Sequence, residues 1–421
     1  MAKKRPVTNK TAADGRRQPS RTGLLEFSAR QGFRYRPNNA SPQAEQTGAG
    51  GGRYLTSAQN FANQVLLSSP EQFRIRDTEA EISCLARAQW AETRYGKRKV
   101  LFLLPGQALG NNVCTLLFLQ AFLEQHKPRE VGVFCAQSAS DIYLQAGNLT
   151  VHALWLARKD LRRWDMVIDL GHLESRRNIE YWPVDMEADL LAAFNMAPSE
   201  RYGAAAKDIS DTSVPRIGIF PLASSPLRTV PPAATLAIIN ALRQRGPIKL
   251  CLNRHQRQGQ LYSRAIAKDL PPSVEIVEAF ASIGGLLDTV AACDYVIVAD
   301  SGPAHMAKLS ATPGVAIYSS APGDVLQGRF TNLARWTVPY EGDHCAAPCG
   351  LAGVRQTVDG RIGCMGSLQL PVEDLPDAPR QQQAGAVDQL FSKPVPCIRH
   401  LADNHGPLVD FIMNDLTGRQ S

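Results

Sequence analysis

The sequence predicts an α/β protein with two Rossmann-like domains that face each other across a cleft. Short apolar runs alternate with helix-like segments, which is the pattern of a parallel sheet with helical crossovers. This alternation occurs twice, before and after a polar, linker-like stretch at residues 199–214. The chain has 421 residues, of which 44% are hydrophobic, so it is long enough for two or three soluble domains.

Residues 1–52 are predicted to form a disordered basic tail. The first 40 residues contain ten Lys or Arg against two acidic residues, a formal charge of +8, whereas the whole chain carries +7. The basic character therefore belongs to the tail. Such a segment can contact an anionic membrane surface or remain a solvated extension, and both interpretations stay open. Residues 53–97 contain helix-like patterns and are predicted to form a helical extension.

Residues 98–205 are predicted to form the first Rossmann-like domain. Its strands are expected where unbroken apolar runs occur, as in sheets that are buried on both faces. A loop containing Gly110-Asn111-Asn112 is expected between the first strand and its helix. The expected strands are residues 100–104, 131–135 and 166–170, and the expected helix is residues 113–125.

Residues 215–375 are predicted to form the second Rossmann-like domain, and residues 376–421 a linker and a C-terminal helix. One expected helix begins at Pro231, where proline is tolerated because the first helical N–H has no partner within the helix. The expected strands are residues 217–221, 248–252, 295–299 and 314–318, and the expected helices are residues 231–243, 283–291 and 303–309.

A chemical motif follows the strand at residues 295–299. Asp300-Ser301-Gly302-Pro303-Ala304-His305 places an acid, a hydroxyl, a glycine and a histidine where a buried strand ends. Ligands of open α/β sheets bind at the carboxyl ends of strands. A helix N-terminus preceded by glycine is also a natural anion site, because its free N–H groups point outward. The motif predicts a turn that holds a phosphate or a polar sugar.

A second polar loop follows the strand at residues 217–221. Hydroxyls and backbone N–H groups can cradle phosphate oxygens, and an arginine can bind them through two parallel hydrogen bonds. Serine-rich loops before helices are also often simple helix caps. The candidate phosphate-binding residues of this loop are Ser224, Ser225 and Arg228.

Four of the nine cysteines occur late in the chain. Cys345, Cys349 and Cys364 have nearly the spacing of a zinc site, and His344 or Cys397 could be a fourth ligand. The usual closely paired CxxC is missing, so a thiol cluster without metal is an equal alternative. The N-terminus lacks an apolar secretory segment and no run is long enough to span a membrane, so a cytoplasmic, reducing location is expected.

The chain resembles glycosyltransferase family 9, the ADP-heptose:lipopolysaccharide heptosyltransferases, over about residues 98–370. Residues 293–307 resemble the family's hallmark, a strand followed by D-(T/S)-G-x-x-H-x-A. Residues 221–231 resemble its phosphate loop, with Arg228 near the usual lysine, and residues 164–170 resemble one of its strands. A late cysteine cluster of the family resembles Cys345, Cys349 and Cys364.

The resemblance implies a GT-B fold, with the acceptor bound by the first domain and a nucleotide-sugar donor by the second. It implies an inverting transfer of heptose or a related sugar, without a metal or cofactor, to a lipopolysaccharide-core, glycan or protein acceptor. The expected location is cytoplasmic, with peripheral contact to the inner membrane through residues 1–40 and no nucleic-acid partner. The implied donor-binding residues are Ser224, Ser225, Arg228, Asp300, Ser301, Gly302 and His305.

The sequence departs from the family at the general base. The family has a Gly-Asp pair where this chain has Gly110-Asn111, and a neutral amide cannot accept the proton of the acceptor hydroxyl. Either another residue takes over, or the alignment is locally shifted, or the protein is catalytically weak, as a degenerate nucleotide-sugar binding protein would be. A nucleotide-sugar epimerase of the same fold is a separate alternative function. The possible substitutes are Asp169, His172 and Glu174, and the candidate catalytic residues are Asn111, His172 and His305.

Overall fold

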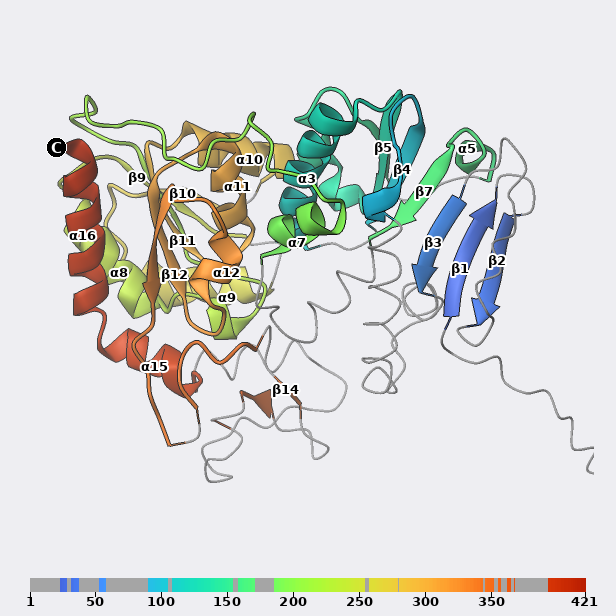
Figure 1. Ribbon diagram of the computed structural model, residues 1–421. Coiled ribbons are helices and arrows are strands. Elements are labelled where there is room, and N and C mark those ends of the chain that lie inside the picture. Colours follow the sequence, from blue (N-terminus) through green and yellow to red (C-terminus); the bar gives the residue numbers. More distant parts are fainter. Residues whose placement is uncertain are drawn as a thin grey trace, which may run out of the picture.

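The protein consists of two halves, one built on a mixed sheet and one on a parallel sheet, each with helices packed on its sheet (Figure 1). The first half comprises the described residues up to 200, and the second half those from 201 onward. The computed structural model describes residues 23–28, 32–37, 53–57, 90–104, 108–153, 158–170, 185–253, 257–278, 280–343, 345–351, 355–356, 362–364, 367 and 393–421.

The first half is built on a seven-stranded sheet of order β2-β1-β3-β7-β4-β5-β6. Its four later strands are parallel, and most of their side chains are buried. These strands are β4 (Lys99–Leu104), β5 (Glu130–Cys135), β6 (Thr150–Ala153) and β7 (Met166–Asp169). The three strands predicted from apolar runs in this half are confirmed, because residues buried on both faces must be apolar throughout.

The predicted disordered tail is wrong for two segments within residues 1–52. Strands β1 (Gly23–Ser28) and β2 (Gly32–Pro37) pair antiparallel, and β1 pairs with β3 (Arg53–Ser57), which continues the sheet in parallel beside β7. The sequence of β2 alternates aromatic and basic residues, which is a strand pattern. Averaging the charge over 40 residues concealed this alternation. Strand β3 likewise replaces the start of the predicted helical extension, and the rest of residues 1–52 lies outside the described residues.

The second half is built on a six-stranded parallel sheet of order β10-β9-β8-β11-β12-β13. When these six strands are numbered 1 to 6 along the chain, their order in the sheet is 3-2-1-4-5-6. This is the doubly wound arrangement, in which the direction of winding reverses between strands 1 and 4. The strands are β8 (Ile217–Phe220), β9 (Ile248–Cys251), β10 (Glu275–Val277), β11 (Tyr295–Ala299), β12 (Gly314–Tyr318) and β13 (Leu333–Thr337).

The helices cover these sheets and form the contact between the halves (Figure 1). The predicted C-terminal helix is in fact two helices, and α16 packs its apolar residues against the second sheet. The helices used below are α3 (Leu109–His126), α4 (Ser140–Leu144), α7 (Met186–Ala193), α8 (Pro232–Leu242), α10 (Ile283–Ala292), α11 (Gly302–Ser310), α15 (Pro396–Asp403) and α16 (Gly406–Gln420).

Helix α3 joins the two halves. Residues 112–122 are all buried, because α3 packs on its own sheet and also against α11 of the second half. A helix that is apolar on all sides requires such complete burial. Phe118 of α3 and Met306 of α11 accordingly belong to one continuous hydrophobic core. The predicted loop at Gly110-Asn111-Asn112 is instead the first turn of α3, where the Asn112 amide donates to the carbonyl oxygen of Ala108 at 2.9 Å.

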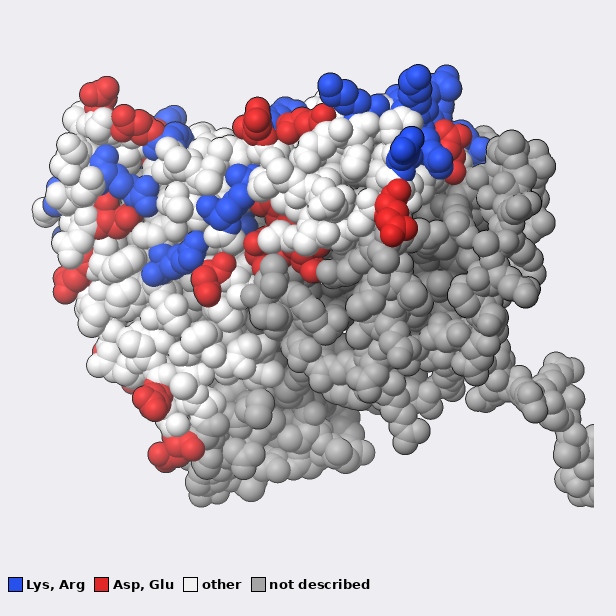
Figure 2. Space-filling model, viewed as in Figure 1, with Lys and Arg blue, Asp and Glu red and all other residues white. Residues whose placement is uncertain are grey.

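The charged side chains on the face shown in Figure 2 are of both signs and are interspersed over much of it, with Lys and Arg gathered above the first sheet. Among the described residues, no helix is both long and apolar enough to cross a lipid bilayer.

Candidate functional site

The candidate site lies where the second sheet reverses its winding direction. Strands β8 and β11 are hydrogen-bonded neighbours, and their carboxyl ends lead into the two polar segments singled out in the sequence. The first segment, residues 221–231, is closed into a loop by the Val230 N–H, which donates to the carbonyl oxygen of Pro221 at 2.9 Å. The second segment is the turn from Asp300 into α11. Ligands of doubly wound sheets bind at such a reversal.

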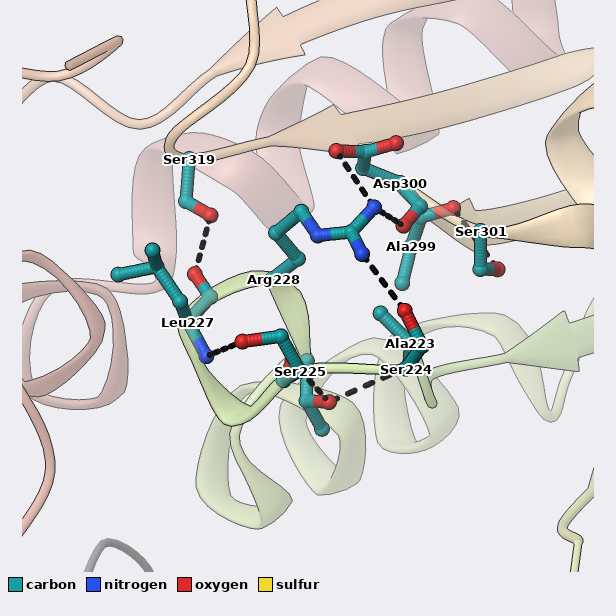
Figure 3. Close-up of polar contacts among 10 residues, drawn as sticks. Ala223, Ser224, Ser225, Leu227, Arg228, Ala299, Asp300, Ser301 and Ser319 are labelled. Carbon is teal, nitrogen blue, oxygen red and sulfur yellow. Dashed lines mark hydrogen bonds and ion pairs between the residues drawn. The ribbon is translucent and has the colours of Figure 1, made fainter. Parts of the chain in front are cut away.

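Arg228 connects these two segments (Figure 3). Its Nη1 donates to the Asp300 carboxylate at 3.3 Å and to the Asp300 carbonyl oxygen at 3.2 Å, and its Nη2 donates to Ser224 Oγ at 2.7 Å. The Arg228 side chain is 15% exposed and that of Asp300 is 3% exposed. These three hydrogen bonds hold the guanidinium in one position. Removing either partner of such a buried ion pair would destabilise the protein, because the other charge would stay buried without it. Burial, followed by the negative charge of Asp300, raises the pKa of the neighbouring Tyr318.

The rest of the loop is shaped by buried hydroxyls. Ser225 Oγ accepts a hydrogen bond from the Leu227 N–H at 3.3 Å, and this caps the short 3-10 helix η3 (Pro226–Arg228). Thr229 Oγ1 accepts from the Ala223 N–H at 3.2 Å. Ser224 is exposed, whereas Ser225 is buried. Ser224 and Asp300 are therefore joined through Arg228, whereas the Ser225 side chain forms its hydrogen bond within the loop.

The N-terminus of α11 is not capped by its preceding side chain. Ser301 occupies the N-cap position, but its hydroxyl donates to the carbonyl oxygen of Ala299 at 3.2 Å, and the first turn of α11 contains no acidic residue. Helix α10 differs, because Ser282 Oγ accepts from the Gly285 N–H at 3.1 Å and Asp141 accepts from the Gly284 N–H at 2.9 Å. The positive end of α11 thus lies beside Arg228 without a carboxylate cap, which favours an anionic ligand.

His305 lies at the contact between α11 and α3. A Cβ atom added to Gly110 would come within 2.7 Å of the His305 ring, and one added to Gly302 would come within 3.0 Å of Leu109. Both glycines therefore permit the close approach of the two helix N-termini. His305 is partly buried, and its Nδ1 is 3.9 Å from Cys114 Sγ. The histidine predicted from the second half is thus in contact with the predicted catalytic segment of the first half.

Only some of the candidate residues of the first half belong to the described part of the chain. Asn111 is in the first turn of α3 and is partly buried. Its neighbour Asn112 is fully buried and accepts a hydrogen bond from the Tyr143 hydroxyl at 2.8 Å. Asp169 ends β7 and is 1% exposed. His172 and Glu174 lie outside the described residues, so the described part of the site contains neither of these two possible bases.

Ser319 is a site residue that the sequence analysis missed. It follows β12, and its hydroxyl donates to the carbonyl oxygen of Leu227 at 2.6 Å, which supports the loop that carries Arg228. The available signal was the same as for Asp300, since Ser319-Ser320 also follows a predicted buried strand at the same edge of the sheet. Among the residues that the structure describes, no group of three or more His, Cys, Asp or Glu is arranged to hold a metal ion.

Comparison with known families gives one match. Residues 158–329 match the model of glycosyltransferase family 9 (heptosyltransferase). This range includes both polar segments of the candidate site, and the resemblance predicted from the sequence is confirmed there. The match indicates a glycosyltransferase. No curated protein matches the chain.

Solved structures similar to this chain have low sequence identity. A glycosyltransferase family 9 protein from Veillonella parvula has 11% identity over 60% of this chain and 90% of that chain, with a TM-score of 0.47. The E. coli ADP-heptose lps heptosyltransferase II has 13% identity over 56% and 90%, with a TM-score of 0.43. The iron-containing dodecameric glycosyltransferase TibC from enterotoxigenic E. coli has 15% identity over 78% of each chain, with a TM-score of 0.47.

Proposed function

We propose that the protein is an inverting glycosyltransferase that moves heptose, or a related sugar, from ADP-heptose to a lipopolysaccharide-core, glycan or protein acceptor. The proposal rests chiefly on the Arg228–Asp300 pair, which lies at the reversal point of the second sheet and inside the segment that matches the family. In this proposal the second half, residues 215–375, binds the donor and the first half, residues 98–205, binds the acceptor.

The donor diphosphate would bind between Arg228 and the N-terminus of α11. A guanidinium forms two parallel hydrogen bonds to phosphate oxygens, and a helix N-terminus supplies N–H groups and a positive dipole end. Sugar transfer breaks the bond between the anomeric carbon and the diphosphate, so negative charge grows on the leaving oxygen. Positioned donors that stabilise such charge often contribute most to the rate. We propose that these groups serve without a divalent cation at the diphosphate.

His305 would act where donor and acceptor meet. Its ring lies at the contact between the two helix N-termini, one from each half. It could therefore hold the transferred sugar or the leaving oxygen while Asn111 orients the acceptor hydroxyl. A base must also take the hydroxyl proton, and we assign this role to His172. An imidazole can accept a proton near neutral pH, whereas the amide of Asn111 cannot.

The proposal can be tested by ligand binding and product analysis. ADP and ADP-heptose should each raise the melting temperature of the full chain, whereas UDP- and GDP-sugars at the same concentration should not, because only ligands that bind the folded state stabilise it. Incubation with ADP-heptose and a lipopolysaccharide-core acceptor should release ADP and give a glycoside of inverted configuration by NMR. Absence of binding by every nucleotide sugar would contradict the proposal.

The same assay separates the transferase from the two alternatives. A degenerate binding protein would bind ADP-heptose without turnover, and an epimerase would change the sugar in the absence of acceptor. The family match gives no support to a protein that has lost its chemistry.

A further inference from the structure

A basic surface lies on the first half, at the amino ends of its parallel strands. Strands β7, β4 and β5 are hydrogen-bonded neighbours, so the turns that lead into them lie side by side. The Arg129 N–H donates to the carbonyl oxygen of Arg98, and the Asp165 N–H donates to that of Lys99, both at 2.9 Å. Lys and Arg gather above the first sheet in Figure 2. We call these three turns the basic edge, and they comprise residues 94–99, 127–130 and 162–165.

The basic edge concentrates positive charge that residues 41–421 lack elsewhere. It contains eight Lys or Arg and two acidic residues, a formal charge of +6. Residues 41–421 together carry −1, because residues 1–40 carry +8 and the whole chain carries +7. The rest of residues 41–421 therefore sums to −7, and the charge of this edge is a local feature.

The two acidic residues of the basic edge are already bound within the fold. Glu130 forms ion pairs with Lys99, at 3.0 Å, and with Arg163, and Asp165 accepts from the Lys99 N–H at 2.8 Å. The other six basic side chains of the edge are exposed and have no ion pair within the part of the chain that the structure describes. These six are Arg94, Lys97, Arg98, Lys127, Arg129 and Arg162. They are available to an anionic partner.

Two of the exposed lysines occupy a backbone conformation that favours glycine. The φ angle is 64° at Lys97 and 46° at Lys127, in the left-handed region. Lys127 ends α3, where glycine or asparagine is usual. The negative end of α3 favours cations beside it, but it does not account for Arg162 and Arg163 before β7. Strained positions are often retained for function, and here the charge is what lysine supplies in place of glycine.

An anionic lipid bilayer fits the basic edge better than a nucleic acid does. The aromatic side chains of the edge, Tyr95 and Trp164, are each 1% exposed, so they cannot stack on bases. The described residues of the edge are turns and the C-terminal end of α3, and none of them presents a helix or strand that could enter a groove. Clusters of about four to eight Lys or Arg bind anionic headgroups through charge alone.

We propose that the basic edge docks the protein on an anionic phospholipid bilayer, through contacts of its Lys and Arg with headgroup phosphates. The edge is separated from the N-terminus of α3, where Gly110 approaches His305, by the length of β4, which is about 20 Å. Docking therefore leaves the candidate site open to its ligands. This surface is distinct from the basic residues 1–40, and the inference is independent of the proposed function.

Vesicle co-sedimentation of the full chain tests the docking surface. The protein should bind vesicles that contain phosphatidylglycerol and should not bind vesicles of phosphatidylcholine alone. Binding should weaken at least about tenfold when the salt concentration is raised from about 0.1 M to about 1 M, because the Debye length falls from about 10 Å to about 3 Å. No binding to the anionic vesicles, or equal binding to both kinds, would overturn the proposal.

A double variant tests the residues of the edge. Lys97→Asn combined with Lys127→Asn should weaken vesicle binding by roughly 30-fold, the loss expected for two cations near a charged surface. Asparagine adopts the left-handed conformation more readily than lysine, so the melting temperature should not fall.

The matched control removes two exposed cations from the second half. Arg264→Gln combined with Lys268→Gln, at the end of α9 (Arg257–Ala267), should keep vesicle binding within about twofold. Residues 1–40 are intact in both double variants. An unchanged affinity of the edge variant would therefore refute the edge as the docking surface.

Two further measurements test the other possible occupants and sites. A single-stranded RNA oligonucleotide that binds more tightly than the vesicles, and loses affinity in the edge variant, would assign the edge to a nucleic acid and overturn the proposal. Anionic vesicles should leave the affinity of the wild-type protein for ADP unchanged, and competition between them would place the lipid at the candidate site instead. Failure to bind ADP at all would contradict only the proposed function.

Discussion

Strands β4 to β7 of the first half have the same order, 3-2-1-4, as the first four strands of the second half, but the chemistry where those strands end differs. In the second half, the ends of β8 and β11 form a polar network around Arg228 and an uncapped helix N-terminus. In the first half, β4 leads into α3, whose Asn112 accepts a hydrogen bond from Tyr143 and whose residues 112–122 are all buried. The same strand order thus leads to a polar network beside a helix N-terminus in one half and to an apolar contact in the other.

This difference suggests that the two halves have different roles in the proposed reaction. The second half supplies fixed positive groups, which would suit the leaving diphosphate of the proposed donor. The first half supplies the surface against which His305 is positioned, through the missing side chain of Gly110. Changes in the second half should therefore affect donor binding and catalysis together, whereas changes in the first half should affect how the two halves fit.

Arg228→Ala should have the largest effect. It removes the guanidinium and deprives the buried Asp300 of this ion pair. We expect kcat/KM for transfer to fall by roughly 100-fold, the loss typical for one positioned donor to a developing charge, and stability to fall by about 3 kcal/mol. Kinetics and thermal unfolding measure both. Arg243→Ala, at the exposed end of α8, is the control for loss of an arginine. A loss of activity below about threefold would contradict the proposed anion site.

His305→Ala should have the next largest effect. We expect transfer to fall by roughly tenfold or more, which is the scale of losing one positioned polar group. Because Arg228 and the end of α11 remain, the affinity for ADP should change much less than kcat. Steady-state kinetics combined with calorimetric ADP titration separate the two quantities. An unchanged turnover with a verified donor would exclude a role for His305 in the reaction.

Gly110→Ala tests the contact between the halves. The new Cβ would lie 2.7 Å from the His305 ring, so the ring or the helix must shift. Overpacking of this kind typically costs about 1–3 kcal/mol, and we expect transfer to fall several-fold. The double variant with His305→Ala should lose little further stability, because the clashing ring is gone. Additive losses of stability in the double variant would show that Gly110 and His305 are not in contact.

Asn111→Asp tests whether the first half lacks the general base of the proposed reaction. A general base contributes about 100-fold or more to a rate. If His172 supplies it, restoring the carboxylate should change kcat by less than about threefold. A rise of the size expected for a base would show instead that the natural chain has lost this group. Asn112→Asp, at the fully buried neighbour, is the matched change, and it should destabilise the fold because Asn112 Oδ1 and Nδ2 both have defined partners.

The sequence predicted the core strands well and the contact between halves poorly. Residues 295–299 are buried on both faces, so their apolar run alone indicates a strand. Ser224, Arg228 and Asp300 could be predicted as one site because they follow strands that a doubly wound sheet places side by side. Strand β2 was missed because its alternation is short and its basic members, Arg34 and Arg36, were counted as part of a basic tail, and the short β1 has no clear alternation. The contact of Gly110 with His305 depends on how two separate sheets dock, and no local pattern encodes that.

Asp141→Ala should have the smallest effect and sharpens the comparison of the two helix N-termini. Asp141 belongs to α4 of the first half and caps α10 of the second, so it contributes to the docking of the halves. Losing a cap typically costs about 1 kcal/mol, and kcat/KM should stay within about twofold because α11 is untouched. Asp288→Ala, on the exposed face of the same α10, should leave stability unchanged. Denaturant unfolding and the transfer assay measure these effects. If Asp141→Ala lowers donor affinity as strongly as Arg228→Ala, the capped and uncapped helix ends do not differ in function, and the anion site must extend to α10.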